Sequence, residues 1–330
     1  MNNTKPLVSV VIPVYNAGEF LAASIESILN QTYQNFEFII INDASTDNSL
    51  KIINKYKKHH QKIKVISLKK NLNCGGDLCA NKGLKKAKGK YVARMDADDV
   101  AHPKRLETQI EFLEKNPGVF LVGSNAYVID KKGNLIGNKL EPQTHESIYK
   151  SYFVIHPIIH PSCMYRRLLP PIRHCERMRS NHIKRTRLPQ PFHGFAMTRK
   201  TKFRYEISYS ANNDYYIFFK LICQGYKFAN LKEKLLYYRI HGNNDTFMHV
   251  KEKFLNTLKI RFNMVLHYGY KPTIKDIFTN IIQTIILLTL PERLTTKLYL
   301  VSKGIIKPKD LIKQTFYFVK RFSFGAFTLR

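Results

Sequence analysis

One short stretch of the chain concentrates carboxylates. The segment "YVARMDADDV" (91–100) places Asp96, Asp98 and Asp99 directly after an apolar run. Like charges this close repel one another, so the arrangement costs stability unless a cation or hydrogen-bond donors compensate it. Divalent cations such as Mg²⁺ prefer oxygen ligands of this kind. The stretch therefore indicates either a divalent-metal site or a solvated acidic turn in which Asp99 caps a helix near "HPKRLETQ".

Two other polar loops also follow predicted strands. β-Branched and apolar runs alternate with helical patterns, and the runs lie at 7–14, 36–43, 63–68, 91–95 and 119–123. One of the helices is expected after "DASTDNS", with Ser45 or Thr46 as its N-cap. This order predicts parallel βαβ units, which bind ligands outside the carboxyl ends of their strands. The loops "PVYNAGE", "NDASTD" and "MDADD" would then meet at one edge of the sheet and share a ligand.

Composition limits the classes of protein to be considered. The 330 residues are enough for one full core and a small second unit, and the net charge of +30 favours partners that carry phosphate. The five cysteines are scattered, which favours free thiols in a reduced cytosolic setting. The first apolar stretch is broken by Pro13 and predicts a strand, not a signal peptide. The run at 281–290 is too short to span a membrane.

A strongly basic segment interrupts the pattern from 166 to 204. It holds twelve Lys or Arg residues, one acid and four prolines, without a sustained hydrophobic period. Such a composition does not favour a packed element. Helical patterning returns at "NNDYYIFFKLICQGYKFANL", with Gly225 as a helix stop. Beyond residue 250 the chain is Lys-rich with helical apolar spacing, so we expect a basic helical region there.

Six motifs in order along the chain resemble those of the inverting nucleotide-sugar glycosyltransferases of family 2. They are "VSVVIPVYN", "INDASTDNS", "NKGLKKAKGKYVARMDADD", "HPSCMYRR", "NDYYIFFKL" and "YYRIHGNN". The resemblance implies an α/β, Rossmann-like GT-A fold, with a central mostly parallel sheet flanked by helices. It would occupy residues 1–248, followed by the helical basic region at 249–330. Within the first part, 168–204 resembles the translated palindromic repeats of some bacterial genes and is expected to form a disordered basic insert.

The resemblance also implies a nucleotide site. By the family pattern, Pro13, Tyr15 and Asp43 would hold the base and ribose of a nucleotide-diphosphate sugar, most often a UDP-sugar. Asn71 and Asn81 match positions near the nucleotide. A surface-loop role remains an alternative for both asparagines, and a helix-capping role remains one for Asp43.

The acidic stretch matches the DxD motif of this family. The resemblance implies that Asp98 binds Mg²⁺ or Mn²⁺, that Asp96 contacts the ribose or the donor sugar, and that His241 reaches the metal or the diphosphate. The cation would neutralise charge that develops on the leaving diphosphate. A purely structural role is the alternative for His241, and Arg239 nearby is expected to pair with phosphate.

The segment "NDYYIFFKL" matches the family segment that carries the catalytic base. The resemblance assigns this base to Asp214, which would take a proton from the acceptor hydroxyl as its oxygen attacks the anomeric carbon. The alternative is that Asp214 caps the helix. The chain departs from the pattern because Asn213 stands where relatives carry Glu. His160, before Pro161, matches a turn beside the acceptor cleft, and a structural role is the favoured interpretation for it.

These expectations lead to one function and two alternatives. The chain is expected to transfer a sugar, with inversion, to a lipid-linked or polysaccharide acceptor for a surface polysaccharide or lipopolysaccharide. It would act in the cytoplasm, with its basic end on anionic lipid of the inner membrane face. One alternative is a glycosyltransferase-like protein that only binds nucleotide. The other is a basic nucleic-acid-binding protein, although no nucleic-acid module is recognisable and no specific nucleic-acid partner is expected.

Overall fold

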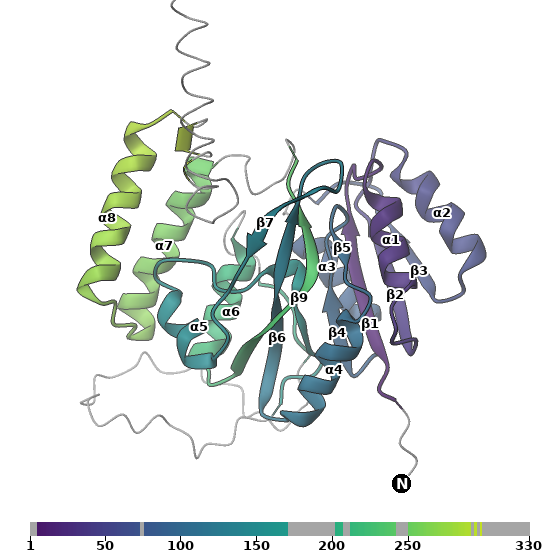
Figure 1. Ribbon diagram of the computed structural model, residues 1–330, viewed down its shortest axis with the longest axis horizontal. Helices are drawn as coiled ribbons and strands as arrows, with labels where there is room; N and C mark the ends of the chain where they lie inside the picture. The colour runs from purple at the N-terminus through teal and green to yellow at the C-terminus, as the bar shows by residue number, and fades with distance from the viewer. Residues whose placement is uncertain are drawn as a thin grey trace, which may run out of the picture.

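The computed structural model describes residues 5–72, 76–170, 202–206, 212–241, 250–291, 294–295 and 298. The strands are β1 (Val8–Val14), β2 (Phe36–Asn42), β3 (Ile63–Ser67), β4 (Tyr91–Arg94), β5 (Val100–Ala101), β6 (Val119–Ile129), β7 (Leu135–Lys139), β8 (Met164–Arg166) and β9 (Lys227–Arg239). The helices are α1 (Leu21–Leu29), α2 (Ser49–His59), α3 (Asp77–Lys86), α4 (Arg105–Lys115), α5 (His145–Ser151), α6 (Asn213–Cys223), α7 (Val250–Tyr268) and α8 (Ile274–Thr289), with a 3₁₀ turn η1 (His160–Ser162). Figure 1 shows their arrangement.

The strands form a single mixed sheet in the order β3-β2-β1-β4-β8-β6-β9-β5, with β7 beside β6. The strands β3, β2, β1 and β4 are parallel to one another. The short β8 is antiparallel to both β4 and β6, so β6 and the parallel β9 run in the same direction as β1. The predicted mostly parallel sheet flanked by helices is confirmed. The carboxyl ends of β1, β2 and β4 therefore lie at one edge.

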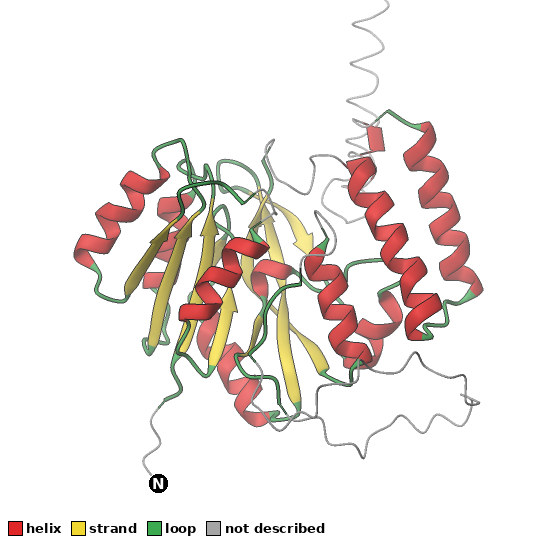
Figure 2. Cartoon of the chain, turned by 180° about the vertical axis from the view of Figure 1, so that it is seen from behind, coloured by secondary structure: helices red, strands yellow, loops and turns green. Residues whose placement is uncertain are grey.

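The sheet separates two apolar layers because successive strand residues face opposite sides. In β1, Val8, Val10 and Ile12 pack in one layer, while Val11 packs in the other. Helices α1, α2 and α4 contribute to the first layer, and α3, α5 and α6 contribute to the second. Figure 2 shows helices on both faces of the sheet. This arrangement fixes where each strand ends, and so where the polar loops lie.

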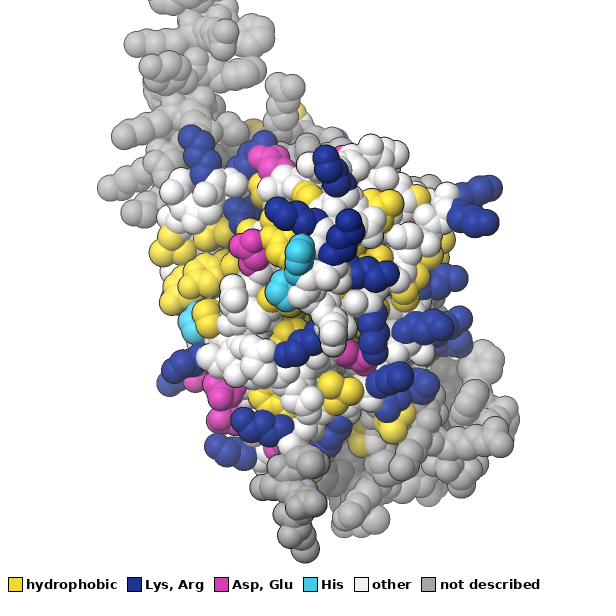
Figure 3. All heavy atoms as spheres, turned by 90° about the vertical axis from the view of Figure 1, so that its right-hand side faces the viewer, with side chains coloured by type: hydrophobic (Ala, Val, Ile, Leu, Met, Phe, Trp, Pro, Cys, Tyr) yellow, Lys and Arg dark blue, Asp and Glu magenta, His cyan; other side chains and the backbone are white. Residues whose placement is uncertain are grey.

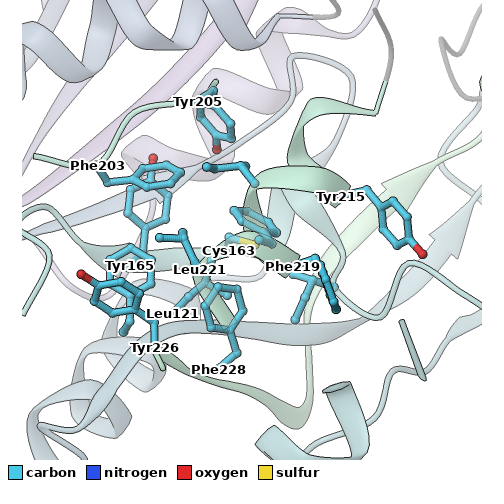
Figure 4. Close-up of a cluster of buried hydrophobic side chains, with 14 of the residues drawn as sticks. Leu121, Cys163, Tyr165, Phe203, Tyr205, Tyr215, Phe219, Leu221, Tyr226 and Phe228 are labelled. Carbon is cyan, nitrogen blue, oxygen red and sulfur yellow. The ribbon is translucent and has the colours of Figure 1, made fainter. Parts of the chain in front are cut away.

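Aromatic side chains fill the layer behind α6. Figure 4 shows Tyr165, Phe203, Tyr205 and Phe228 among them. The rings of Phe203 and Tyr205 pack edge to face with their centroids 5.1 Å apart, and both residues are buried. Aromatic pairs with this geometry stabilise a core beyond the area that they bury. The cluster therefore supports α6, and with it the start of that helix, from beneath.

Several local expectations can be compared with the structure. Helix α2 begins at Ser49 after Asn48, so the expectation of a cap at Ser45 or Thr46 is wrong. Both residues instead form hydrogen bonds with Asn16 in the loop after β1. The helix stop at Gly225 is confirmed: α6 ends at Cys223, and Gly225 has a φ of 96°. Positive φ is accessible to glycine because it has no Cβ.

The ordered core reaches into the predicted insert. Residues 171–201 lie outside the described residues, so their predicted disorder stays a prediction. Leu168 forms an antiparallel bridge with Lys202, and Phe203 is only 5% exposed. The described residues on either side of 171–201 therefore lie next to each other at the core. The packed part extends further than the predicted boundaries of 168 and 204.

The helices α7 and α8 differ from the rest in their surface. Large apolar side chains are exposed on both helices: Leu255, Phe262, Val265, Leu266, Ile274, Ile277, Phe278, Ile281, Ile282, Ile285 and Leu288. The buried Arg261 of α7 donates hydrogen bonds to the Asn280 side chain of α8 and to the Val154 carbonyl, which attaches the pair to the core. Within the described ranges, no helix combines the length and apolar character that crossing a bilayer requires.

Candidate active site

The first two loops at the sheet edge are joined by hydrogen bonds. The Asn16 backbone N–H donates to Ser45 Oγ at 3.1 Å, and Asn16 Oδ1 accepts from the Thr46 N–H at 2.8 Å. Asn16 has a φ of 48° and Ala44 one of 55°, conformations that few residues other than glycine and asparagine adopt readily. The loops after β1 and β2 thus form one rigid rim. Tyr15 lies on it and is 52% exposed.

Asp43 lies at the inner side of this rim. Its Oδ1 accepts a hydrogen bond from the Leu72 N–H at 3.1 Å, and its carbonyl accepts one from Asn71 Nδ2 at 3.1 Å. Burial raises the pKa of the carboxyl, and the bond from Leu72 opposes that rise. Pro13 is the penultimate residue of the neighbouring buried strand β1. The structure therefore brings together Pro13, Tyr15, Asp43 and Asn71, and their binding of a nucleotide stays a prediction.

Asn81 has a different setting. Its Nδ2 donates to the Tyr205 carbonyl at 2.8 Å, and its Oδ1 accepts from the Tyr205 N–H at 2.9 Å. Both ends of the amide are thus engaged by one backbone segment. These bonds fix residues 202–206 against α3, and the predicted role of Asn81 near the nucleotide stays a prediction.

Asp96 is paired with a buried cation. Arg94, at the end of β4, is 2% exposed, and its Nη1 lies 2.8 Å from Asp96 Oδ1. Burial raises the pKa of the Asp96 carboxyl, the positive charge of Arg94 lowers it, and Asp98 raises it again. The acids at the end of β4 are therefore compensated in part by a guanidinium from the same strand. Sequence analysis did not identify Arg94, although an arginine within an apolar strand indicates a buried positive charge.

Asp98 faces His241. Asp98 Oδ2 and His241 Nε2 are 3.0 Å apart, and the His241 ring also packs against Phe20 with centroids 4.6 Å apart. Both side chains are partly buried, with exposed fractions of 26% for Asp98 and 10% for His241. The two residues predicted to bind metal thus meet, although 143 positions separate them.

Asp99 and Arg239 hold the acidic loop onto β9. Asp99 Oδ1 accepts the Arg239 backbone N–H at 2.8 Å, and Arg239 Nε donates to the Asp98 carbonyl at 2.8 Å. Arg239 Nη1 donates to the carbonyls of Asp130 and Lys131. The proposal that Asp99 caps α4 is wrong, because that helix begins at Arg105 after Lys104. These hydrogen bonds to backbone carbonyls would compete with the expected pairing of Arg239 with phosphate.

Asp214 lies in the first turn of α6 beside two histidines. Its Oδ2 is 3.0 Å from His156 Nε2 and 3.6 Å from His160 Nδ1. His160 Nε2 in turn is 2.8 Å from the Tyr205 hydroxyl. The N-cap residue of the helix is Asn212, and Asp214 Oδ1 accepts the adjacent Tyr215 N–H. The N-cap alternative for Asp214 is therefore wrong, and its carboxylate belongs to a side-chain cluster instead.

The electrostatics of this cluster favour an ionised carboxylate. Burial by itself raises the pKa of Asp214, but His156, followed by His160, lowers the pKa below the usual range for aspartate. Burial lowers the pKa of His160 to about 3, so this imidazole is neutral near pH 7. Asp214 thus carries a negative charge at neutral pH, as a group that accepts a proton must.

Sequence analysis missed other buried polar residues near the site. Asp77 opens α3 and Arg105 opens α4, and their exposed fractions are 6% and 0%. Arg105 Nη2 donates to the carbonyls of Arg94 and Cys163, which ties β4 to the turn η1. Its burial lowers the pKa to about 10. His156 was missed as well, although "HPIIHPS" repeats a His-Pro pair with a four-residue spacing.

The pair of Asp98 and His241 presents ligand atoms that suit a divalent cation. A carboxylate oxygen and an imidazole nitrogen already point toward each other, and both are ligand types that Mn²⁺ accepts. In the described part of the chain, no cluster of three or more His, Cys, Asp or Glu side chains forms a full protein cage. Mg²⁺ and related cations at phosphate sites commonly use one or two protein carboxylates together with substrate oxygens. The residues present fit that arrangement.

The curled sheet with an acidic carboxyl edge is the Rossmann-like GT-A fold of nucleotide-sugar-dependent transferases. The profile of Glycosyl transferase family 2 matches residues 9–169. An uncharacterized glycosyltransferase of Methanocaldococcus jannaschii is 34% identical over 270 residues, which cover 80% of this chain and 82% of the relative. The chain belongs to glycosyltransferase family 2, and it is a glycosyltransferase.

Other similarities are more local or concern the fold alone. A putative glycosyltransferase of Bacillus subtilis, EpsE, is 43% identical over 145 residues, covering 44% of this chain and 51% of the relative. Among solved structures, a mannosyltransferase from Pyrobaculum calidifontis in complex with GDP-Man and Mn²⁺ has a TM-score of 0.53 at 15% identity. That alignment covers 93% of this chain and 82% of the mannosyltransferase.

Proposed function

We propose that the chain transfers a sugar, with inversion, from a nucleoside-diphosphate sugar to a glycan or lipid-linked acceptor, assisted by Mg²⁺ or Mn²⁺. The observation that carries the proposal is the separation of two chemical functions at one sheet edge. Asp98 and His241, 3.0 Å apart, would bind the cation, whereas Asp214 is a separate carboxylate beside two imidazoles. An inverting transfer needs these two functions on opposite sides of the reacting carbon and no protein nucleophile.

The donor would lie along the rim formed by the loops after β1 and β2. Asp43 would offer a carboxylate, and Tyr15 an exposed ring, to the base and ribose. Asp96 would contact the ribose or the donor sugar. Asn71 supports this rim through its bond to the Asp43 carbonyl. Structural neighbours have been solved with UDP-GlcNAc and with GDP-Man. We take UDP as the carrier to test first.

The proposed chemistry is a single displacement. Asp214 accepts the proton of the acceptor hydroxyl while the oxygen lone pair forms a bond to the anomeric carbon. The bond between that carbon and the diphosphate oxygen breaks, and its electrons leave with the diphosphate. A divalent cation bound at Asp98 and His241 would neutralise the charge on this leaving group. His156 holds the Asp214 carboxylate in position through the 3.0 Å contact at Oδ2.

The surface of α7 and α8 supports a lipid-linked acceptor. Phe262 and Phe278 are 65% and 61% exposed, and a groove of about 580 Å³ between α7, α8 and Phe153 is lined largely by apolar side chains. Soluble proteins rarely expose a continuous apolar face without a partner. We infer that this face lies on the anionic, cytoplasmic leaflet, where basic residues add to the attraction. Basic side chains are also spread over the face that carries α1 and α2 (Figure 3).

A nucleotide-binding screen tests the proposed donor and cation. Thermal unfolding is measured with UDP, UDP-GlcNAc, UDP-glucose, GDP and GDP-mannose, each with and without Mn²⁺. A ligand that binds only the folded state raises its stability by mass action. We expect a Mn²⁺-dependent increase for at least one nucleotide sugar. Absence of any increase would refute the proposed donor class, and an increase without turnover would favour the alternative of a nucleotide-binding, inactive relative.

A second measurement addresses the acceptor side. The protein is sedimented with vesicles of phosphatidylcholine alone or with phosphatidylglycerol added, and the variant Phe262→Ser/Phe278→Ser is compared. Binding that needs the anionic lipid and is weakened in the variant supports the membrane assignment. Equal binding by the variant would show that the face of α7 and α8 is not the contact surface.

A further inference from the structure

Asp77 is a buried acid that the proposed reaction does not use. It is the first residue of α3 and is 6% exposed. Its Oδ1 has no hydrogen-bond partner among the described residues. Native proteins pair most buried polar oxygens, because an unpaired oxygen loses its bonds to water without replacement. An oxygen of this kind beside an active site is therefore a candidate for contact with the substrate.

Asp77 lies between the two halves of the site. Gly76, with a φ of 88°, turns the chain so that a Cβ at this position would lie 3.2 Å from Pro13 Cγ and 3.4 Å from Arg94 Nη2. The start of α3 thus touches the donor side. The charged groups that act most strongly on Asp77 are Asp214, Arg94 and Asp96. Asp77 is consequently near both the proposed base and the acidic end of β4.

The chemistry of Asp77 suits a hydroxyl group. Burial raises the pKa of its carboxyl well above the usual range, Asp214 raises it further, and Arg94 opposes the rise. A protonated carboxyl offers one donor and further acceptor capacity, and an ionised one offers acceptors only. A sugar hydroxyl both donates and accepts, so it can satisfy Oδ1 in either state. A polar interaction with the Asn213 side chain keeps Asp77 oriented from the α6 side.

We propose that Asp77 binds a hydroxyl group of the transferred sugar and so helps to select the donor. This inference rests on the proposed function, because it takes the diphosphate to lie at Asp98 and the acceptor hydroxyl at Asp214. The sugar must lie between these two groups, and Asp77 is near Asp214 as well as near Asp96, two residues before Asp98. A site that pairs a buried polar group with a substrate hydroxyl rejects analogues without the hydroxyl, since the protein group is then left unpaired.

A structural role for Asp77 makes a different prediction. A carboxylate in the first turn of a helix interacts favourably with the helix dipole, so its loss would lower stability and leave sugar binding unchanged. Under the substrate-binding role, removal of the buried carboxyl with its unpaired Oδ1 raises the stability of the ligand-free protein and weakens sugar binding. The two roles therefore predict different results for both measurements.

The test compares Asp77→Ala and Asp77→Asn with the parent protein. Calorimetry at pH 7.5 with Mn²⁺ gives the affinity for UDP-GlcNAc, UDP-glucose and GDP-mannose relative to UDP or GDP alone. For Asp77→Ala we expect the additional affinity contributed by the sugar to fall by about tenfold or more. The affinity for the nucleoside diphosphate should stay within about twofold. Asp77→Asn keeps an oxygen and a donor in place, so its loss should be smaller.

Glu146→Gln serves as the matched control, because Glu146 is a carboxylate in the first turn of α5 and is remote from the site. It should leave every affinity unchanged. An unchanged sugar contribution in Asp77→Ala would overturn the inference while the proposed function stands. So would a parallel loss of nucleoside-diphosphate affinity, or a parent protein that binds no nucleotide sugar more tightly than its diphosphate. Failure of the parent to bind any nucleotide would refute the proposed function itself.

Discussion

The donor side and the acceptor side of the site stabilise their carboxylates with different groups. On the donor side, the permanently charged guanidinium of Arg94 pairs with Asp96, and backbone groups bind Asp43 and Asp99. On the acceptor side, imidazoles contact Asp214. Guanidinium keeps its charge at every physiological pH, whereas the imidazole of His160 is neutral near pH 7 because burial lowers its pKa to about 3. We therefore expect the two sides to respond to acid through different groups: Asp43 and Asp96, whose pKa values burial raises, on the donor side, and Asp214, whose pKa is lowered by His156, on the acceptor side.

The largest expected effect separates chemistry from donor binding. Asp214→Asn should lower turnover by about 10²- to 10⁴-fold, which is the usual contribution of a positioned base. The donor affinity should be unchanged, because the amide has nearly the same shape and lies away from the rim of Asp43. Steady-state kinetics and calorimetry provide the two values. A parallel loss of donor affinity would show that the two sides are not independent.

This assay also needs a control for the basic insert. A variant without residues 171–201 is measured alongside, since the bridge between Leu168 and Lys202 brings the two ends of that segment together. If Asp214→Asn has full turnover in whichever parent is active, Asp214 is not the base.

The next effect concerns the cation. Asp98→Asn should abolish the Mn²⁺-dependent part of donor stabilisation, because an amide oxygen carries no formal charge. At 100 times the dissociation constant, that part amounts to about 2.7 kcal/mol for the parent protein. His241→Ala should cause a smaller loss, since the carboxylate remains. Thermal unfolding with UDP, with and without Mn²⁺, measures both, and an undiminished Mn²⁺ effect in Asp98→Asn would contradict the metal assignment.

A third prediction uses the pH response of the acceptor side. His156 lowers the pKa of Asp214, so His156→Ala should raise that pKa toward its ordinary value. A carboxyl with a lowered pKa adds stability above its unfolded pKa, about 3.9, and loses it as pH falls through the folded value. The variant should be less stable at pH 7, and the acidic limb of its rate profile should move to higher pH. Turnover at pH 7.5 should fall by about tenfold through poorer positioning.

The matched control for this variant is His102→Ala, a histidine outside the cluster that stacks on Tyr237. Its rate profile should keep the parent shape. If His156→Ala leaves the acidic limb in place, the imidazole does not control Asp214.

The smallest effect concerns the buried acid between the two sides. The pKa of Asp77 is raised in the folded state, so its favourable contribution is complete below about pH 3.9 and is lost as pH rises through the folded pKa. Asp77→Asn should therefore raise stability at pH 7.5 by about 1 kcal/mol. The difference should vanish near pH 3.5, where both side chains are neutral. Denaturant unfolding at the two pH values checks this, and a stability loss at pH 7.5 would contradict it.

Much of the donor side follows from neighbouring residues in the chain. Asp96 and Asp98 are adjacent to a strong strand pattern, and the rule for parallel sheets places strand ends at one edge. The same rule predicted that Asp43 and Tyr15 lie at that edge. Helix starts were less predictable: Ser45 and Thr46 bind the loop of Asn16 instead of capping α2. Side-chain competition between two loops is a tertiary effect, so a local capping pattern could not reveal it.

The sequence by itself determined the alternating strands and helices, the acidic edge and the family. Apolar periodicity depends on the burial of one face, and this periodicity is visible in a single segment. Only the tertiary structure decided that His156 holds Asp214, that His241 faces Asp98, and that Asp77 is buried between them. These contacts join segments that are 58 and 143 positions apart for the two histidine pairs. Their distances and pKa shifts depend on packing and local dielectric, which exist only once the chain has folded.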